Sequence, residues 1–202
     1  ETEKKTFTAD NENVFTNGGF EDEGFELASV VDTTAAVSKV NDAKDGSYAL
    51  KVEPGVNNPW VNIGTNVEWQ IDRKYRYSFD IKVLSFANGT EVTSGKADLR
   101  SLVNFTDANA TKGSQHSDYI NSALAVGEWQ HIEGIIDLDA VTSNGGKGIA
   151  SDADLSDGVF AFFFIPVNGQ NYNYIIDNIS LVRLPYETDV DISFDFDNAD
   201  AK

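Results

Sequence analysis

The chain of 202 residues has no cysteine, no methionine, only four prolines and few basic residues for its number of acids. Without cysteine it can form neither a disulfide scaffold nor a thiolate site for zinc or an iron–sulfur cluster. Its 15 Lys and Arg residues against 33 Asp and Glu residues give a formal net charge of −18. That charge repels nucleic-acid phosphates and anionic lipid surfaces. No apolar run approaches the ~18 residues of a membrane-spanning helix, so we expect no membrane span.

The start of the chain also lacks two features of a newly translated protein. It begins Glu1-Thr2-Glu3-Lys4-Lys5, without an initiator Met and without an apolar signal core, which predicts a mature product or an excised fragment. The absence of cysteine fits an extracellular or cell-surface protein that does not rely on disulfides.

Alternating apolar and polar residues dominate what is present. In Tyr75-Arg76-Tyr77-Ser78-Phe79-Asp80-Ile81-Lys82-Val83 the odd positions are apolar and the even positions polar, which is typical of a half-buried strand. The sequence predicts further strands at 48–52, 60–64, 99–105, 129–138, 158–167 and 174–184, separated by turns such as Asp45-Gly46 and Asn88-Gly89. No long segment repeats at helical spacing, so we expect an all-β sandwich or barrel.

The domain organisation that we predict has three parts. Residues 1–12 form a flexible N-terminal segment, residues 13–184 form one β-sandwich, and residues 185–202 form an acidic linker or tail. For the acidic stretch that starts at Glu187, an added strand or the start of a neighbouring domain is the alternative.

Three ordered segments carry a resemblance to a known family. They are Asn17-Gly18-Gly19-Phe20-Glu21, Asp45-Gly46-Ser47-Tyr48-Ala49-Leu50-Lys51-Val52 and Ile176-Asp177-Asn178-Ile179-Ser180-Leu181. Together they resemble the carbohydrate-binding modules of the family 4, 9 and 22 group, closest to family 4, as attached to bacterial xylanases and glucanases. The resemblance implies a jelly-roll β-sandwich of two antiparallel sheets, like galactose-binding domains, and a bacterial extracellular or cell-surface protein.

The same segments contain acids from distant parts of the chain. Two carboxylates that meet repel each other unless a cation or a proton lies between them, and Ca²⁺ accepts carboxylate and backbone oxygens. The resemblance implies a structural Ca²⁺ here, with ligands at Gly19, Glu21, Asp45 and Asp177. The alternative is that these acids are solvated and hold no ion.

A sugar-binding face needs aromatic and polar residues that the core does not use. The resemblance implies that the concave sheet binds a glycan there. In one predicted strand, core residues alternate with Trp60 and Asn62. In another, they alternate with Arg100 and Asn104, whose side chains can hydrogen-bond to sugar hydroxyls. The polar loop that follows contains Tyr119. We also expect Phe105, His116, Phe163 and Tyr172 at this face, with Gln115 as a polar neighbour. Trp69 shares its parity with core residues and is expected to be buried.

No catalytic motif accompanies these residues. The Glu-x-Asp-x-x-Glu pattern of jelly-roll glucanases, a Gly-x-Ser-x-Gly motif and a phosphate-binding loop are all missing. We therefore expect a non-catalytic module that binds a neutral β-1,4-linked plant polysaccharide, xylan or a β-glucan, and targets a covalently attached glycoside hydrolase. The alternative is a jelly-roll adhesion or protein-docking domain, because the strand around Phe163 is apolar on both faces.

Overall fold

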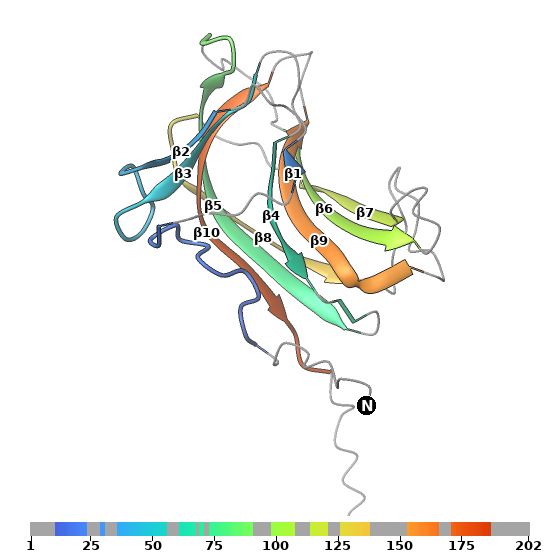
Figure 1. Cartoon of the computed structure of the whole chain (residues 1–202). Helices are drawn as coiled ribbons and strands as arrows, with labels where there is room; N and C mark the ends of the chain where they lie inside the picture. Colours follow the sequence, from blue (N-terminus) through green and yellow to red (C-terminus); the bar gives the residue numbers. More distant parts are fainter. Residues whose placement is uncertain are drawn as a thin grey trace, which may run out of the picture.

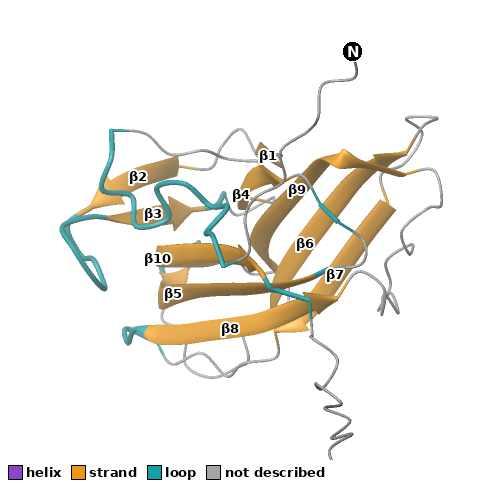
Figure 2. Ribbon diagram, turned by 90° about the horizontal axis from the view of Figure 1, so that it is seen from below, coloured by secondary structure: helices purple, strands orange, loops and turns teal. Residues whose placement is uncertain are grey.

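The computed structural model describes residues 11–23, 29–30, 36–55, 61–67, 69–70, 73–90, 98–107, 114–120, 126–137, 153–165 and 171–186. These residues form ten strands and no helix, arranged as two five-stranded sheets packed face to face (Figures 1 and 2). Within these ranges nothing has the length and apolar character of a helix that could cross a membrane. We name the sheets the β10 sheet and the β9 sheet after their central strands.

The β10 sheet has the strand order β2-β3-β10-β5-β8, and every neighbouring pair is antiparallel. The strands are β2 (Ala36–Val40), β3 (Ala49–Glu53), β5 (Lys74–Phe86), β8 (Gln130–Asp137) and β10 (Tyr172–Arg183). Strands from both ends of the chain therefore meet here, since β10 lies between β3 and β5.

The β9 sheet has the order β1-β4-β9-β6-β7, again with antiparallel neighbours throughout. Its strands are β1 (Ser29–Val30), β4 (Val61–Val67), β6 (Asp98–Asp107), β7 (Ser114–Ile120) and β9 (Ala153–Ile165). In both sheets, strands that lie side by side are often far apart in the chain. The chain therefore crosses repeatedly between the two sheets. The predicted all-β sandwich of two antiparallel sheets is confirmed.

The core lies between the sheets and follows the predicted alternation of β5. Its odd positions, from Tyr75 to Val83, are at most 4% exposed. Trp69 is 2% exposed and meets Tyr75 edge to face, with ring centroids 4.6 Å apart, which confirms its expected core role. The core also takes in Phe20, Leu50, Ile136, Tyr172, Ile176 and Leu181.

The N-terminal segment extends the β10 sheet. Asn13 pairs with Val182, the amide of Val14 donates to the carbonyl of Leu181 at 2.8 Å, and the amide of Ile179 donates to Gly18 at 2.9 Å. A Cβ on Gly18 would collide with the backbone carbonyl of Ile179, so this approach requires glycine. Contact with β10 thus explains the first glycine of the Asn-Gly-Gly motif.

Every strand that the sequence predicts is present, with ends shifted by a few residues. The sequence misses β1, β2 and β7, and the prediction of a loop at 113–120 is wrong because β7 occupies 114–120. The β7 sequence, Ser-Gln-His-Ser-Asp-Tyr-Ile, has no apolar alternation, and it becomes a strand by pairing with β6. The predicted terminal segments fall mostly outside the described residues, so the domain boundaries stay a prediction.

Candidate functional site

One buried residue, Val67, shows which residues of the β9 sheet face the core and which face outward. Val67 is 4% exposed and belongs to the core cluster. Val67 pairs with Gly158, and Gly158 pairs with Phe105 on the next strand. Directly paired residues lie on the same face, and successive residues alternate between faces. Phe105 therefore occupies the core-side face and not the glycan-binding face where it was expected, and the even-numbered residues of β6 from 98 to 104 occupy the outward face.

Several predicted binding residues come together in one row of this outward face. Arg100 pairs with Tyr119 of β7 on one side and with Phe163 of β9 on the other. Asn62 precedes Ile63, the partner of Phe162, and so stands beside Phe163 on β4. We call Asn62, Phe163, Arg100 and Tyr119 the ring row. These residues are far apart in sequence, and only the strand order brings them together.

A second outward row contains Asn104. Asn104 pairs with Gln115 of β7 and with Val159 of β9, and Val159 pairs with Asn66 of β4. We call Asn66, Val159, Asn104 and Gln115 the amide row. Asn66 is absent from the residues that the sequence predicted; its parity with Asn62 on the same strand is the signal that could have found it.

The outward face lies on the inside of a bend in the sheet. Figure 1 shows β9 and β6 curving along their length, with a sharper bend near the start of β9. The register between β6 and β9 shifts between Phe105 and Thr106, immediately beyond the amide row. A β-bulge of this kind bends the strand that carries it. The ring row and the amide row therefore lie on the hollow side of the β9 sheet.

Other predicted binding residues are placed elsewhere. His116 pairs with Val103, one position away from Arg100, and so occupies the opposite face from the ring row. Trp60 lies outside the described residues. The expectation that Tyr172 lines the rim of the groove is wrong: Tyr172 is 1% exposed and its ring lies 5.1 Å from Phe86 in the core. Tyr174 is also buried, and burial raises the pKa of its phenol.

The predicted metal residues gather around a single loop. Glu21 Oε1 accepts hydrogen bonds from the amides of Ser47 at 2.8 Å and Tyr48 at 2.9 Å. These two bonds lower the pKa of Glu21, which is solvent-exposed. Gly46 has a φ of +68°, and a Cβ on it would meet the Glu21 carboxylate at 2.5 Å. Glu21 therefore holds the C-terminal end of the loop between β2 and β3.

Asp177 holds the other end of the same loop from a fully buried position. Its Oδ2 accepts from the amides of Lys44 at 2.8 Å and Asp45 at 3.2 Å, and its Oδ1 accepts from the amide of Asn178 at 2.7 Å. Burial, with a smaller effect from the Asp80 carboxylate, raises the pKa of Asp177, although the three amides oppose this shift. Gly19 is also near, since a Cβ on it would lie 4.0 Å from Asp177 Oδ1.

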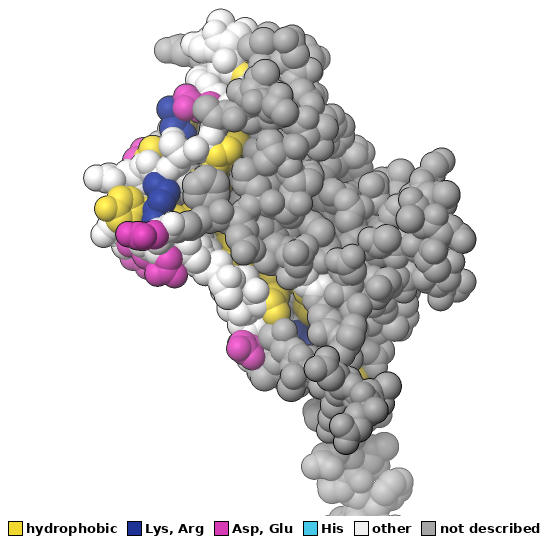
Figure 3. Space-filling model, in the orientation of Figure 1, with side chains coloured by type: hydrophobic (Ala, Val, Ile, Leu, Met, Phe, Trp, Pro, Cys, Tyr) yellow, Lys and Arg dark blue, Asp and Glu magenta, His cyan; other side chains and the backbone are white. Residues whose placement is uncertain are grey.

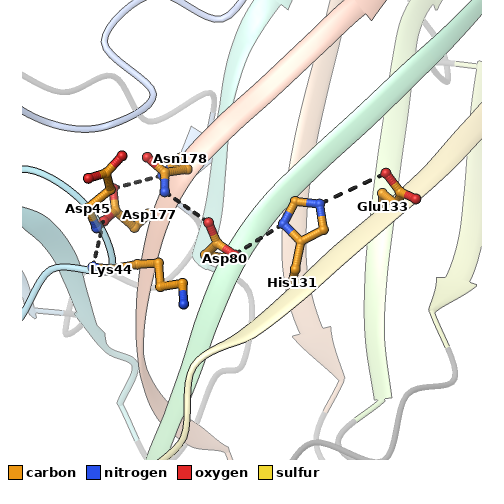
Figure 4. A network of polar contacts seen from close by, with 7 residues as sticks. All are labelled: Lys44, Asp45, Asp80, His131, Glu133, Asp177 and Asn178. Carbon is orange, nitrogen blue, oxygen red and sulfur yellow. Dashed lines mark hydrogen bonds and ion pairs between the residues drawn. The ribbon is translucent and has the colours of Figure 1, made fainter.

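A polar network continues from Asp177 across the outward face of the β10 sheet (Figure 4). Asp177, Asp80 and His131 are directly paired on β10, β5 and β8. Asn178 Nδ2 donates to Asp80 Oδ2 at 2.9 Å, and His131 Nδ1 lies 3.1 Å from Asp80 Oδ1. Asn178 has a φ of +51° at a register shift in β10, which carries its amide towards Asp80.

These contacts fit a cation only in part. No group of three His, Asp or Glu side chains in the described part of the chain is arranged to hold a metal. The two carboxylates are nevertheless fastened to the same loop, and Asp177 is buried close to Asp80. Glu21 Oε2 accepts none of the hydrogen bonds found among the described residues. A Ca²⁺ ion would therefore need Glu21, Asp177 and several backbone carbonyls together.

Charged side chains on the outward face of the β10 sheet form ion pairs and contacts with aromatic rings. Lys82 pairs with Asp42 of the loop at 2.5 Å and lies 5.1 Å from the Trp129 ring. Lys39 lies 4.8 Å from the Tyr48 ring. Figure 3 shows acidic and basic side chains interleaved at the β2–β3 side of the molecule. A loop and ion pairs lie on part of this face, whereas the outward face of the β9 sheet carries the ring and amide rows.

Comparison with known proteins relates this fold to solved structures. No family model and no curated protein matches the sequence. The CBM22-1 xylan-binding domain of Paenibacillus barcinonensis Xyn10C has a TM-score of 0.55 at 14% identity, over 90% of this chain and 98% of that one. A family 16 carbohydrate-binding module has a TM-score of 0.53 at 19% identity, over 84% and 99%.

The same fold also occurs outside carbohydrate-binding modules. The Stig cyclase Fisc from Fischerella sp. TAU has a TM-score of 0.54 at 12% identity, over 88% of this chain and 99% of that one. At these identities the likeness establishes the fold alone. The chain thus has the jelly-roll fold of the family 22 and family 16 carbohydrate-binding modules, in agreement with the resemblance seen in its sequence, and its function has to be argued from its own residues.

Proposed function

We propose that this protein is a non-catalytic carbohydrate-binding module. Its ligand is a neutral β-1,4-linked plant polysaccharide, xylan or a β-glucan, bound on the outward face of the β9 sheet. The observation that carries this proposal is the ring row, in which the register sets Arg100 between Tyr119 and Phe163. The solved structures of similar fold include carbohydrate-binding modules, which supports the same conclusion.

The composition of the ring row suits a sugar. Aromatic rings stack on the apolar C–H faces of sugar rings, and Arg100 supplies a planar fork of donors that matches neighbouring hydroxyl groups. The row contains no Asp or Glu, whereas glycoside hydrolysis normally needs two carboxylates at a defined separation. The formal charge of −18 disfavours acidic glycans. Binding without cleavage of a neutral glycan follows from this combination.

The remaining parts of the proposal concern context. We propose that the module is attached to a glycoside hydrolase, such as a xylanase, in a secreted or surface-bound bacterial protein. The proposed site includes Trp60, Asn62, Arg100, Asn104, Tyr119 and Phe163, and excludes Tyr172.

Affinity electrophoresis in gels that contain soluble xylan or β-glucan tests the proposal. We expect the wild-type protein to be retarded and Arg100→Ala to lose about ten- to hundredfold in affinity, since a hydrogen bond to a charged group contributes about 1.5–3 kcal/mol. Tyr119→Ala should also weaken the retardation, because it removes a ring that stacks on the sugar. His131→Ala is the matched control, because His131 lies on the outward face of the other sheet. Absence of retardation on both polysaccharides contradicts the proposal, and release of reducing sugar contradicts the non-catalytic part.

We also propose a structural Ca²⁺ between the β2–β3 loop and β10. Glu21 and Asp177 would supply carboxylate oxygens, and Gly19 and the Asp45 region would supply backbone carbonyls. The support is that both carboxylates are attached to the loop that spans Lys44 to Tyr48. Free Ca²⁺ at 100 times its Kd would add about 2.7 kcal/mol to the free energy of unfolding.

Thermal unfolding with Ca²⁺ and with a chelator tests this second proposal. We expect a higher melting temperature with Ca²⁺ in the wild type and a much smaller difference in Glu21→Gln. Equal melting temperatures for the wild type in both buffers would show that no stabilising Ca²⁺ site exists. Glu53→Gln is a control, because Glu53 pairs with Lys51 at 2.8 Å outside this loop.

A further inference from the structure

The chain leaves the β10 sheet through Leu184, which follows the last residue of β10. The amide of Leu184 donates to the carbonyl of Lys74, the first residue of β5, at 2.9 Å. One residue earlier, the carbonyl of Arg183 accepts from the amide of Asn11 at 2.9 Å. The backbone of this exit is therefore held by the start of β5 and by the N-terminal segment.

Arg73 holds the same exit with its side chain, although the residue is only 6% exposed. Its Nε and Nη2 donate to the carbonyl oxygen of Leu184 at 3.1 and 2.6 Å, so the guanidinium fork closes on one backbone oxygen. The guanidinium carbon also lies 3.9 Å from the centroid of the Tyr186 ring, in cation–π contact. Since Tyr186 is 56% exposed and Arg73 is buried, the ring lies on the solvent side of the guanidinium.

A second buried arginine, Arg183, fastens the exit from the side of β10. Its Nη1 donates to Gln70 Oε1 at 2.6 Å. Gln70 is itself held, because its amide donates to the Tyr75 hydroxyl at 2.9 Å and its carbonyl accepts from the amide of Arg73 at 3.2 Å. Separating a buried charge from its partner is costly. These contacts therefore favour one geometry of the exit.

The residues that hold the exit belong to the connection between the two sheets. Gln70 and Arg73 lie after Val67, the last residue of β4, and before Lys74, the first residue of β5. Strand β4 also carries Asn62 of the ring row. The exit is therefore attached to the segment that leads directly from the β9 sheet to the β10 sheet.

Pro185 stiffens the chain between the two residues that Arg73 contacts. A proline fixes its own φ at about −65° and disfavours helical backbone in the residue before it, which here is Leu184. Three successive residues are thus restrained: Leu184 by hydrogen bonds, Pro185 by its ring and Tyr186 by stacking.

We propose that Arg73 and Tyr186 form a latch that makes this exit a fixed junction. The latch sets the position and direction in which the chain continues after Tyr186, relative to the ring row. A fixed junction limits how an attached part of the protein can turn about the module, whereas a loose exit would leave it free to rotate. The latch does not depend on glycan binding, so its test is separate from that of the proposed function.

Amide hydrogen exchange of the full chain, followed residue by residue by NMR, tests the latch. Opening of the exit exposes the Leu184 amide, so the exchange rate of that amide measures how often the latch opens. Tyr186→Ala should raise the rate about two- to fivefold, the effect of one exposed cation–π contact. Tyr186→Phe keeps the ring and should exchange like the wild type. Arg73→Lys keeps the charge, loses the fork and should raise the rate about ten- to hundredfold.

The control variant is Arg76→Lys, because Arg76 is an exposed arginine of β5, and the internal reference is the amide of Ile176 in the middle of β10. If Leu184 exchanges no faster in Arg73→Lys and Tyr186→Ala than in Arg76→Lys, there is no latch. If Arg73→Lys accelerates Leu184 and Ile176 equally, Arg73 only stabilises the whole fold, and the proposal is overturned. Should Arg73→Lys fail to fold, Tyr186→Ala and Tyr186→Phe decide: a faster rate in the alanine variant alone supports the latch, and equal rates overturn it.

Discussion

The two sheets use their outward faces in opposite ways. On the β10 sheet the β2–β3 loop is fastened over the strands by Glu21 and Asp177, and Lys82 pairs with Asp42. On the β9 sheet the register assembles rings, amides and Arg100. Several polar groups of the first face are paired within the chain. The second arranges amides, rings and Arg100 in rows that we propose bind an external ligand. In the function that we propose, stability and recognition therefore depend on different sheets.

Among the tests that compare the two sheets, we expect the largest loss of stability from a substitution at Gly18, which contacts the β10 sheet. Gly18→Ala places a Cβ against the carbonyl of Ile179 and must push the N-terminal segment away from β10. We expect a loss of about 3 kcal/mol in the free energy of unfolding, the upper range for overpacking. Urea unfolding measures it.

Gly19→Ala is the matched control for that variant, because nothing lies within 3.4 Å of a Cβ there and its nearest neighbour is Asn178 Oδ1 at 3.8 Å. Equal stability of the two variants would show that the close approach of Gly18 to β10 contributes nothing. We expect the chain with Gly19→Ala to remain within about 1 kcal/mol of the wild type.

A second test compares the two acids that hold the loop. The pKa of Asp177 is raised in the folded protein, so its carboxyl group stabilises the fold increasingly as the pH falls towards its ordinary value of 3.8. The pKa of Glu21 is lowered, so its contribution is present above its ordinary value of 4.5 and is lost as the pH falls through the folded pKa. The two acids should therefore give opposite pH dependences.

Urea unfolding of Asp177→Asn and Glu21→Gln in a chelating buffer, from about pH 7 to about pH 3, measures these dependences. Relative to Asp177→Asn, the wild type should gain stability as the pH falls. Relative to Glu21→Gln, it should lose stability below pH 4.5. If both differences have the same sign, the assignment of a buried and an exposed carboxylate is wrong.

A third test compares one substitution on the outward face of each sheet. Asn104→Ala on the β9 sheet should weaken glycan binding about three- to tenfold and leave the melting temperature nearly unchanged, because one neutral hydrogen bond to the ligand is lost. His131→Ala on the β10 sheet should leave binding unchanged. The comparison fails if His131→Ala weakens binding as much as Asn104→Ala does.

The smallest effect is expected for the ion pair of Lys82. Its partner Asp42 has a side chain that is 53% exposed, so solvent screens the pair. Lys82→Ala should lower the free energy of unfolding by less than about 1 kcal/mol. The difference from the wild type should shrink further in about 0.5 M salt. A larger loss that is independent of salt would mean that packing against Trp129 dominates instead of charge.

Local patterns in the sequence were sufficient for much of the fold. The alternation of Tyr75 to Val83 predicted β5 and its buried face. The motifs around Glu21, Asp45 and Asp177 pointed to residues that meet at one loop. Parity also placed Arg100 and Asn104 on one face of β6. These features depend on neighbours along the chain or on the identity of a few residues.

Other features escaped sequence analysis for a common reason. Ser114 to Ile120 was expected to be a loop, yet it forms β7 because β6 pairs with it. Tyr172 was expected at the groove, yet the packing of β10 against Phe86 buries it. Asn66 was overlooked because its importance depends on standing across from Val159. Each depends on a partner far away in the sequence.

The sequence by itself determined that this is an acidic, cysteine-free, all-β chain with a set of core positions and candidate glycan and metal residues. Periodicity and turn chemistry suffice for that, since they act over a few neighbouring residues. The tertiary structure alone decided which candidates share a row. Register between strands is set by long-range pairing, and a shift of one residue moves a side chain to the other face. That is why Arg100, Tyr119 and Phe163 share one row while His116 lies on the opposite face.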